Sequence, residues 1–325
     1  MIETFNNIHD FIRDKGRELL TSGKEVVSTN SDNVGTDKNA LYELPHQFFK
    51  IKDYDKTVFN IKGFKTQPWW MVGEVLTEFL ALNPPVMNNY APDIIDKSYK
   101  LTPQGTCEYM YGTRWMEHNQ IEHVREKLTK NPTTKKALIQ TWMPYDAESS
   151  RKDSPCNINY MFLARDGKLD MTATIRSNDL FKGVKYDYFL ASMMMQSMAG
   201  NTGLEPGELY FHINSLHAYE GDFGKLEKIV QTANDFKPVS LKLEPSDSKT
   251  FWHDLNKVKQ AEEAAYNRGW NSFDNKMAKI KTPLLVDFAR VMGIKNAKFY
   301  KDNYKKLQLE NNIQNPEVKA WLGVK

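Results

Sequence analysis

The chain has 325 residues, which is enough for one large domain or two smaller ones with a sizeable hydrophobic core. Its 44 basic and 41 acidic residues leave a net charge of only +3, so the charge gives no indication of a nucleic-acid partner. No apolar run approaches the ~18 residues that a membrane span needs, and the N-terminus lacks the apolar core of a signal peptide. Two cysteines cannot build a disulfide framework. We therefore expect a cytoplasmic globular protein without a membrane or direct nucleic-acid partner.

The first half of the chain reads mainly as helices separated by polar loops. Apolar residues recur at helical spacing in three segments, and each segment is followed by Gly, Pro or Asn-Pro. Residues 24–40 are rich in Ser, Thr, Asn, Asp and Gly and are predicted to form a loop. The predicted helices run from Ile2 to Gly23, over residues 69–82 before Pro84 and Pro85, and from Trp115 to Leu128 before Asn131-Pro132.

The middle of the chain is predicted to contain strands. Residues 137–143 are predicted to form one strand, and two alternating runs follow at 157–164 and 169–175. A central Asp166-Gly167 between such runs is the strongest short-range signal of a β-hairpin with a two-residue turn.

This hairpin would fix the neighbours of Cys156. Cross-strand partners would have residue numbers that sum to 333, so Cys156 would lie opposite Ser177, with Arg176 as a diagonal neighbour. Contact between Cys156 and Arg176 would require a β-bulge or a frayed strand end, because strict alternation puts them on opposite faces. A cysteine near a guanidinium has a lowered pKa and is more nucleophilic. For Cys107, which has no such neighbour, we expect a small buried hydrophobe.

The remaining segments are predicted to be helical. Residues 192–200 indicate a buried helix, whose methionines are expected in the core and not in a metal site. After residue 240 the pattern changes to Lys-rich helical segments at 250–268, 281–293 and 297–309. We therefore divide the chain at this point into residues 1–240 and a helical extension, residues 241–325.

Motifs on both sides of the hairpin resemble the thymidylate synthase family. Pro155-Cys156 precedes the hairpin, and an Arg-Ser-x-Asp-x-x-x-Gly-x-x-x-Asp segment and a His-x-Tyr motif follow it in the family's order. Upstream, Tyr111-Gly112-x-x-Trp115 is similar to the family's Tyr-Gly-x-x-Trp segment. The resemblance implies a three-layer α/β fold around a large mixed β-sheet, with residues 1–240 as the catalytic domain and sheet-to-sheet pairing in a homodimer.

The resemblance also implies which residues carry the chemistry. Cys156 would be the nucleophile that adds to C6 of a pyrimidine nucleotide, and C5 would then attack the one-carbon unit of 5,10-methylenetetrahydrofolate. Tyr111 would help to order the water relay that removes the C5 proton. Glu74 is the preferred general base acting through water, and Glu78, one helical turn later, stays open as an alternative.

Other motif residues would hold the nucleotide. Arg176 and Ser177 would bind the 5′-phosphate, for which a bidentate guanidinium is well suited. His217 and Tyr219 would hydrogen-bond the sugar hydroxyl. Ser177 with the His-x-Tyr pair favours deoxyribose over ribose.

The folate and the partner subunit would complete the site. Asp179 would accept hydrogen bonds from the pterin ring, and Gly183 would let the backbone approach the ligand closely. In the family, two arginines of the partner subunit reach the phosphate. Lys135 and Lys136 stand at the matching positions here, so their participation would require at least a dimer.

Asp187 is the departure from the family pattern that bears on the substrate. Thymidylate synthases have Asn at this position, which offers a donor and an acceptor to uracil. A carboxylate accepts from the cytosine amino group and favours protonation of N3, but it repels O4 of uracil. Asp187 would thus act in binding and in catalysis. Together with Asn157 it resembles the deoxycytidylate hydroxymethylases of large bacteriophages, which implies dCMP as substrate and 5-hydroxymethyl-dCMP as product.

Several alternatives remain open. A dCMP methyltransferase and a CMP hydroxymethylase would need the same residues, since the product depends on whether hydride or water adds to the one-carbon unit. A non-catalytic nucleotide- or RNA-binding protein on this scaffold is disfavoured, because Cys156, Arg176 and Tyr111 are all present. A zinc cytidine deaminase needs Pro-Cys-x-x-Cys, which is absent after Pro155, and no metal is expected.

Overall fold

A computed structural model describes residues 2–26, 40–61, 66–99, 101–103, 105–148, 154–244, 247 and 249–324. The described residues form a mixed sheet of seven strands, in the order β1-β3-β7-β6-β5-β4, with β2 also pairing with β3. β1 with β3 and β6 with β7 run parallel, and the other pairs are antiparallel. The strands are β1 (Glu3–Phe5), β2 (Lys24–Val26), β3 (Leu41–Ile51), β4 (Ala137–Gln140), β5 (Asn157–Arg165), β6 (Lys168–Asp179) and β7 (Glu205–Tyr219).

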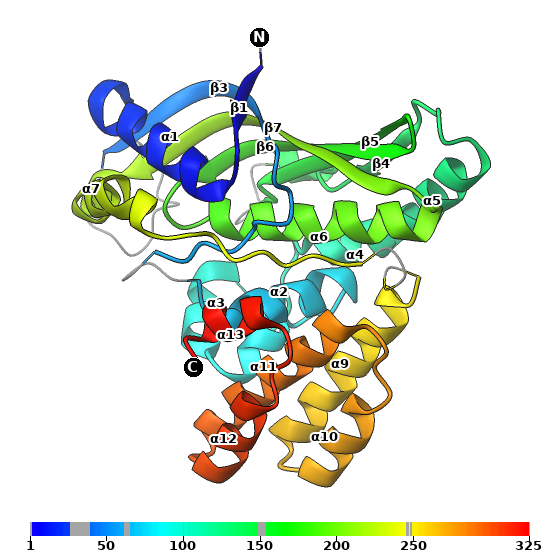
Figure 1. The fold of residues 1–325 in the computed structure, drawn as a ribbon. Coiled ribbons are helices and arrows are strands. Elements are labelled where there is room, and N and C mark those ends of the chain that lie inside the picture. The colour runs from blue at the N-terminus through cyan, green and yellow to red at the C-terminus, as the bar shows by residue number, and fades with distance from the viewer. Residues whose placement is uncertain are drawn as a thin grey trace.

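Helices cover one face of the sheet in successive layers (Figure 1). α1, α6 and α7 lie beneath the strands, α2 packs against the far side of α6, and α9 and α11 pack against α2. The expected α/β fold around a large mixed sheet with additional C-terminal helices is thus confirmed. The helices are α1 (Ile8–Ser22), α2 (Pro68–Phe79), α3 (Pro92–Tyr99), α4 (Tyr111–Met116), α5 (Gln120–Lys130), α6 (Val184–Thr202), α7 (Phe223–Thr232), α9 (Phe251–Tyr266), α10 (Trp270–Met277), α11 (Pro283–Phe299), α12 (Asn303–Asn311) and α13 (Pro316–Leu322).

The first predicted helix begins later than its apolar pattern suggests. The Asn7 side chain accepts hydrogen bonds from the backbone N–H groups of His9 and Asp10 and caps α1. The preceding residues, Glu3–Phe5, pair with β3 as a strand instead. In the predicted loop 24–40, residues 24–26 form β2, and 27–39 lie outside the described residues.

Three other predicted elements are shorter than expected or divided. The second helix ends at Phe79, because Ala81 has a left-handed backbone with φ of 51°. The third is divided into α4 and α5 at His118 and Asn119, whose φ angles are 58° and 53°. The strand predicted over residues 137–143 ends at Gln140.

The hairpin and its register are confirmed, together with the bulge that contact with Arg176 requires. The numbers of paired residues sum to 333 from the Arg165–Lys168 pair to the Asn159–Thr174 pair. The register then shifts by one residue, so that Asn157 pairs with Ile175. The backbone N–H of Arg176 consequently donates to the carbonyl oxygen of Cys156 at 2.8 Å. The bulge therefore brings Arg176, and not Ser177, opposite the cysteine.

α6 and the C-terminal helices form most of the remaining core. The predicted methionine stripe is buried, with Met193, Met194 and Met195 fully inaccessible. The three predicted C-terminal segments correspond to α9, α11 and α12, while α10 and α13 were not predicted. Phe79 of α2 stacks on Trp252 of α9 with a centroid distance of 5.0 Å, so the C-terminal helices support α2.

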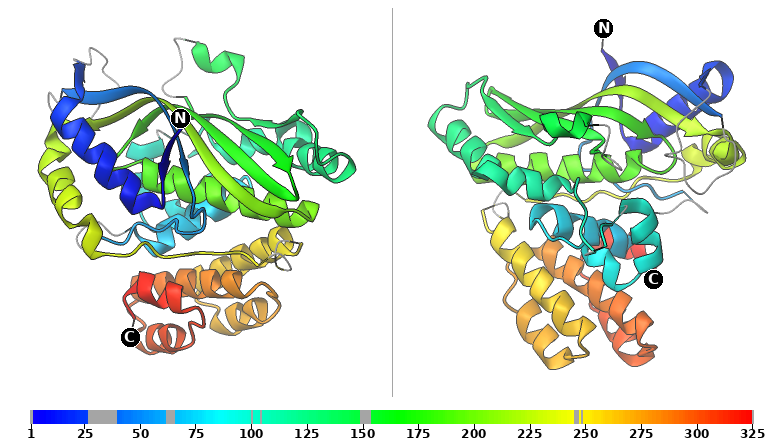
Figure 2. Two further views of the ribbon diagram at one scale, coloured as in Figure 1. Left: turned by 45° about the horizontal axis from the view of Figure 1, so that its top comes forward. Right: turned by 180° about the vertical axis from the view of Figure 1, so that it is seen from behind.

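The other face of the sheet is not covered by a described helix over β5–β7 (Figure 2, left). Along β5, Tyr160 and Phe162 are buried, whereas Met161 and Leu163 are 41% and 42% exposed. Leu138 of the neighbouring β4 is 40% exposed and extends the apolar surface. Within the described ranges, no helix is both long and apolar enough to cross a bilayer.

Candidate active site

A pocket of about 280 Å³ lies where α2, the start of α4, the residues preceding β5 and the first turns of α6 meet. Six residues singled out in the sequence come together in its wall, although they are spread over more than 100 positions of the chain. The lining residues are Glu74, Glu78, Tyr109, Met110, Tyr111, Ser154, Cys156, Gly183, Tyr186, Asp187 and Leu190.

Arg176 holds the segment that carries Cys156. Its Nε donates to the carbonyl oxygen of Pro155 at 3.0 Å, and its Nη2 donates to that of Ser154 at 2.8 Å. The guanidinium also lies over the ring of Trp142, 5.7 Å from the centroid. The guanidinium is thus held against the segment that leads into the half-buried Cys156.

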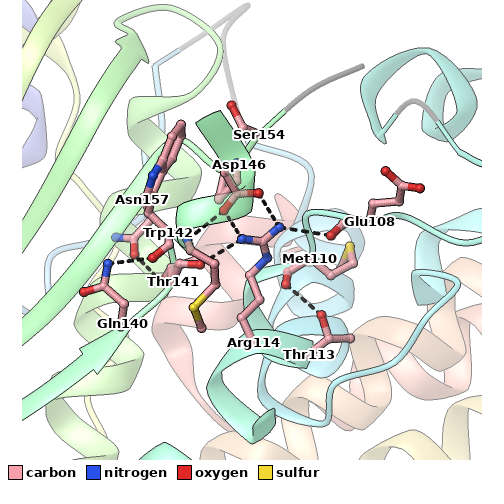
Figure 3. Close-up of polar contacts among 12 residues, drawn as sticks. Glu108, Met110, Thr113, Arg114, Gln140, Thr141, Trp142, Asp146, Ser154 and Asn157 are labelled. Atoms are coloured by element: carbon pink, nitrogen blue, oxygen red, sulfur yellow. Dashed lines mark hydrogen bonds and ion pairs between the residues drawn. The ribbon is translucent and has the colours of Figure 1, made fainter. Parts of the chain in front are cut away.

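A buried polar network anchors the strand that follows the cysteine (Figure 3). Arg114 forms a two-pronged ion pair with Asp146 and donates to the carbonyl oxygens of Thr141 and Glu108. The Thr141 hydroxyl in turn donates to Asn157 Oδ1 at 2.6 Å. Because Asn157 directly follows Cys156, this network fixes the backbone on which the cysteine is presented.

Tyr111 reaches the same backbone from α4. Its hydroxyl accepts a hydrogen bond from the N–H of Asn157 at 3.3 Å. Burial raises the pKa of Tyr111 well above 10, with contributions from the nearby Asp187 and Cys156, so the phenol is a neutral donor. Tyr111 is therefore placed to hydrogen-bond a group held between Cys156 and Asp187.

Glu78 holds the backbone at Tyr111 and Gly112 through hydrogen bonds. Its Oε2 accepts from the backbone N–H of Gly112 at 2.6 Å, and its carboxylate also accepts from that of Tyr111. Burial, together with the charge of Asp187, raises its pKa to about 8. Gly112 is required here, because a Cβ would lie 1.8 Å from the carbonyl oxygen of Glu78.

Glu74 stands one helical turn earlier on the pocket wall. Its Oε1 accepts from Nε1 of Trp70 at 2.9 Å, and its charge acts on Lys185 and Tyr186 across the pocket. Glu74 is more accessible than Glu78, which is 6% exposed. The two acids therefore differ in exposure and in hydrogen-bond partners, although the sequence could not separate them.

Asp187, in the first turn of α6, lines the same pocket as Cys156 and Glu74. Burial raises its pKa from 3.8 to about 7, while a hydrogen bond from the Asn178 side chain opposes the rise. Asp187 thus holds or loses a proton near neutral pH, which neither an exposed aspartate nor an asparagine would do.

The remaining predicted ligand residues lie at the adjoining ends of β6 and β7. Ser177 pairs with Ser215, and Asp179 pairs with His217. Burial lowers the pKa of His217, and its Nδ1 has no hydrogen-bond partner among the described residues. The ring of Tyr219 packs edge-on against that of His217 at 5.5 Å, so the two residues are presented together.

Asp179 is only in part available to a ligand. Its Oδ1 accepts from the backbone N–H groups of Phe181 and Lys182, both at 2.8 Å. Its Oδ2 lies 4.0 Å from Nζ of Lys182, which pairs more closely with Asp222 at 3.0 Å. The donor set therefore leaves one carboxylate oxygen for the N–H groups of a heteroaromatic ring.

Lys135 and Lys136 lie elsewhere on the chain. Both side chains are exposed before β4, and neither lines the pocket around Cys156. Lys136 lines a separate groove with His118, His123 and Lys127. Among the described residues, no group of three or more His, Cys, Asp or Glu side chains could hold a metal ion.

Sequence reasoning missed several residues of the site. Asn178 was passed over as a spacer of the Arg-Ser-x-Asp motif, and Tyr109, Tyr186 and Leu190 carried no motif signal at all. Alternation could not have pointed to Asn178, because the buried positions of β6 are 169, 171, 173 and 175, and the pattern changes phase before residue 178.

Comparison with known proteins agrees with this geometry. The family model described as "Thymidylate synthase" matches residues 36–278, a range that extends past residue 240 to the end of α10. The putative thymidylate synthase of Methanosarcina acetivorans is 36% identical over 131 residues, which are 39% of this chain and 60% of that protein. The thymidylate synthase of Mycoplasma pneumoniae is 24% identical over 157 residues, or 47% of this chain and 54% of that protein.

A solved structure shares the fold. Thermostable thymidylate synthase A from Bacillus subtilis superimposes with a TM-score of 0.57 at 19% identity, covering 69% of this chain and 84% of that one. The chain spans about 60% or less of the length of the curated relatives it matches. Because the family model matches most of the chain, the chain belongs to the thymidylate synthase family.

Proposed function

We propose that the protein transfers a one-carbon unit from 5,10-methylenetetrahydrofolate to C5 of dCMP, with water adding to give 5-hydroxymethyl-dCMP and tetrahydrofolate. Membership of the thymidylate synthase family supports one-carbon transfer to a pyrimidine nucleotide. The observation that carries the choice of cytosine is Asp187, which shares the wall of one pocket with Cys156.

The protonation of Asp187 gives cytosine its advantage. Since its pKa is about 7, a large share of the carboxyl groups is ionised at neutral pH and above. Opposite cytosine it accepts from the amino group and shares one proton with N3, which is a base. Opposite uracil it faces O4, a much weaker base, and must take up a whole proton to avoid repulsion. Asp187 therefore favours cytosine.

Cys156 carries the covalent step in this proposal. Its thiolate adds to C6, the electron pair of the C5–C6 bond moves to C5, and C5 becomes nucleophilic. The folate co-substrate supplies the one-carbon unit that C5 attacks. Glu74 takes the C5 proton through water, and the neutral Tyr111 hydroxyl holds that water in place. Loss of that proton would break the bond between the one-carbon unit and the folate nitrogen, so that tetrahydrofolate leaves and an exocyclic methylene remains on the base. Water would then add to this methylene, and elimination of the Cys156 thiolate from C6 would restore the aromatic base.

Glu74 fits the role of base better than Glu78. The Glu78 carboxyl group is committed to the backbone N–H groups of Tyr111 and Gly112, whereas Glu74 stands on the pocket wall. We assign Glu78 the role of a positioning residue that fixes Tyr111. This division separates two acids that lie only one helical turn apart.

The ligands' other contacts follow the family pattern. Arg176 and Ser177 would take the phosphate, and His217 and Tyr219 the sugar hydroxyl. One oxygen of Asp179 fits the pterin N–H groups, and Gly183 admits the ligand. Those of these residues that belong to β6 and β7 lie at the adjoining ends of the two strands.

We also propose a homodimer in the cytoplasm, paired through the open face of the sheet. The exposed Leu138, Met161 and Leu163 would be buried by a second copy. Lys135 and Lys136, which lie away from the pocket of their own chain, would then reach the phosphate site of the partner.

Product analysis tests this function. Purified protein is incubated with dCMP and 5,10-methylenetetrahydrofolate. The mass of the nucleotide product is measured by mass spectrometry, and formation of dihydrofolate is followed by its absorbance. A gain of one CH2O unit without dihydrofolate is expected, and Cys156→Ser should abolish it. A gain of one CH2 unit with dihydrofolate would instead establish a methyltransferase, and product from CMP alone would overturn the choice of deoxyribose.

A further inference from the structure

Asn178 is a polar residue in an apolar part of the core. It stands next to the end of β6, is 3% exposed, and borders a small internal space lined mostly by apolar side chains such as Phe11, Val184 and Tyr188. Its Oδ1 is buried and has no hydrogen-bond partner among the described residues. A buried amide in this position is unfavourable for folding unless its N–H2 group forms a hydrogen bond.

The other end of that amide meets Asp187. Interaction with the Asn178 side chain lowers the pKa of the Asp187 carboxyl group, and because a carboxylate only accepts hydrogen bonds, the amide N–H2 is the group that acts on it. A donor on one carboxylate oxygen fixes the plane of the group. The second oxygen is then left for the pocket that Asp187 shares with Cys156.

Gly183 makes room for this contact. A Cβ at position 183 would lie only 2.5 Å from Asn178 Oδ1, so any other residue would displace the amide. The backbone N–H of Asp187 donates to the carbonyl oxygen of Gly183 at 3.2 Å and ties the aspartate to the same turn. Three positions of the Arg-Ser-x-Asp segment thus form one unit: Asn178, Gly183 and Asp187.

We propose that Asn178 is a positioning residue for base selection, which holds the Asp187 carboxyl group in the orientation from which it reads the pyrimidine. This inference rests on the proposed function, since it concerns how Asp187 discriminates cytosine from uracil. It also gives Gly183 a second task beside the folate contact, because the missing side chain admits the amide.

The test compares Asn178→Ala with Ser192→Ala as a matched control. Ser192 is also buried, lies on α6, donates to the carbonyl oxygen of Tyr54 at 2.6 Å, and does not contact Asp187. For each protein, kcat/KM is measured for dCMP and for dUMP. We expect the ratio of the two values to fall by roughly tenfold in Asn178→Ala, the scale of one lost charge-assisted hydrogen bond, and to stay unchanged in Ser192→Ala.

A second readout needs no substrate. Titration of the Asp187 carboxyl carbon by NMR, assigned with Asp187→Asn, should show a higher pKa in Asn178→Ala, because a lost donor disfavours the charged form. If the Ala variant does not fold, Asn178→Ser is used, whose hydroxyl is too short to hold the carboxyl group.

The two readouts separate this inference from the proposed function. An unchanged pKa of Asp187 in a folded variant would overturn the contact, whatever the protein turns over. A raised pKa with an unchanged nucleotide ratio would overturn the role in base selection. If wild-type protein turns over neither nucleotide, the proposed function fails, and the ratio of dissociation constants for dCMP and dUMP decides the inference instead.

Discussion

Glu78 and Asp187 are two acids in one pocket, and burial raises the pKa of both to near or above neutrality, to about 8 and about 7. Removal from water penalises the charged form of each, and the charge of Asp187 adds to the rise at Glu78. Ionisation of such buried groups destabilises the folded protein. They are typical of sites where a proton is shared or moved.

The raised pKa of Asp187 predicts a pH-dependent gain in stability for Asp187→Asn. A carboxyl group whose folded pKa lies above its unfolded value of 3.8 binds its proton more tightly in the native state. The folded protein therefore loses stability as pH rises from about 4 to about 7. At pH 8 the variant should be more stable by roughly 1–3 kcal/mol, and the difference should vanish below pH 4.

Urea unfolding of both proteins at pH 4 and pH 8 measures this difference. A variant that is equally or less stable at pH 8 would show that the carboxyl group is not desolvated. Since Asn keeps the size of the side chain, the comparison reports the charge and not the packing.

The two acids on α2 predict different losses of activity. Glu74→Gln removes the proposed base and should lower kcat by about 10²–10⁴-fold. Glu78→Gln keeps an acceptor for the N–H groups of Tyr111 and Gly112, so kcat should fall by less than about tenfold, below the loss expected for a general base. Steady-state kinetics of the two variants distinguish the roles. A larger loss of kcat in Glu78→Gln than in Glu74→Gln would mean that Glu78 is the general base and Glu74 the positioning residue.

At the scale of elements, the hairpin could be predicted in detail because its determinants are local. Asp166-Gly167 fixes the turn, and the turn fixes every pair as far as Asn159 and Thr174. Contact between Arg176 and Cys156 required a β-bulge or a frayed strand end, and the structure has a bulge at the start of β5. Its exact position depends on what anchors Asn157 from outside the hairpin, and no local pattern shows that.

Other elements depended on tertiary contacts and were therefore missed. Residues 3–5 continue the apolar pattern of α1 but pair with β3, since an edge position was available. The kink at His118 and Asn119 requires left-handed backbone at two residues without glycine. The candidate site was predictable where a motif carried it, whereas Tyr109, Tyr186 and Leu190 are gathered only by the packing of α4 and α6.

Gly→Ala substitutions at positions 183 and 224 should have opposite effects on the stability of the folded protein. In Gly183→Ala the new Cβ would meet Asn178 Oδ1 at 2.5 Å, and displacing that buried amide should cost roughly 1–3 kcal/mol. In Gly224→Ala, on α7, nothing lies within 4 Å of the new Cβ, and the change should stabilise the protein by about 0.5–1 kcal/mol. Thermal unfolding compares them, and equal effects would mean that position 183 is not crowded.

At the scale of the whole molecule, the sheet separates a face covered by helices from a face with exposed apolar side chains. The C-terminal helices lie on the covered side, where α9 and α11 pack against α2, the helix that carries Glu74 and Glu78. This placement indicates that the C-terminal helices support α2. The division between residues 240 and 241 stays a prediction.

The proposed dimer predicts complementation between two inactive variants. Cys156→Ser lacks the nucleophile, and the double variant Lys135→Ala/Lys136→Ala lacks the cations that would reach the partner's phosphate site. A mixed dimer contains one site with Cys156 from one chain and both lysines from the other. Mixing the two proteins under subunit exchange should restore activity to about a quarter of the wild-type level, the statistical share of intact sites. No recovery in mixed dimers would place the lysines outside the partner's site.

The choice of base by Asp187 is tested most directly by competition between dCMP and dUMP, each labelled at C5 and followed by release of the label. The wild-type protein should release label from dCMP in preference to dUMP, and Asp187→Asn should reverse the preference, because the amide offers uracil the donor and the acceptor that the carboxylate cannot. Preferential release from dUMP by the wild-type protein, or an unchanged preference in Asp187→Asn, would contradict the account.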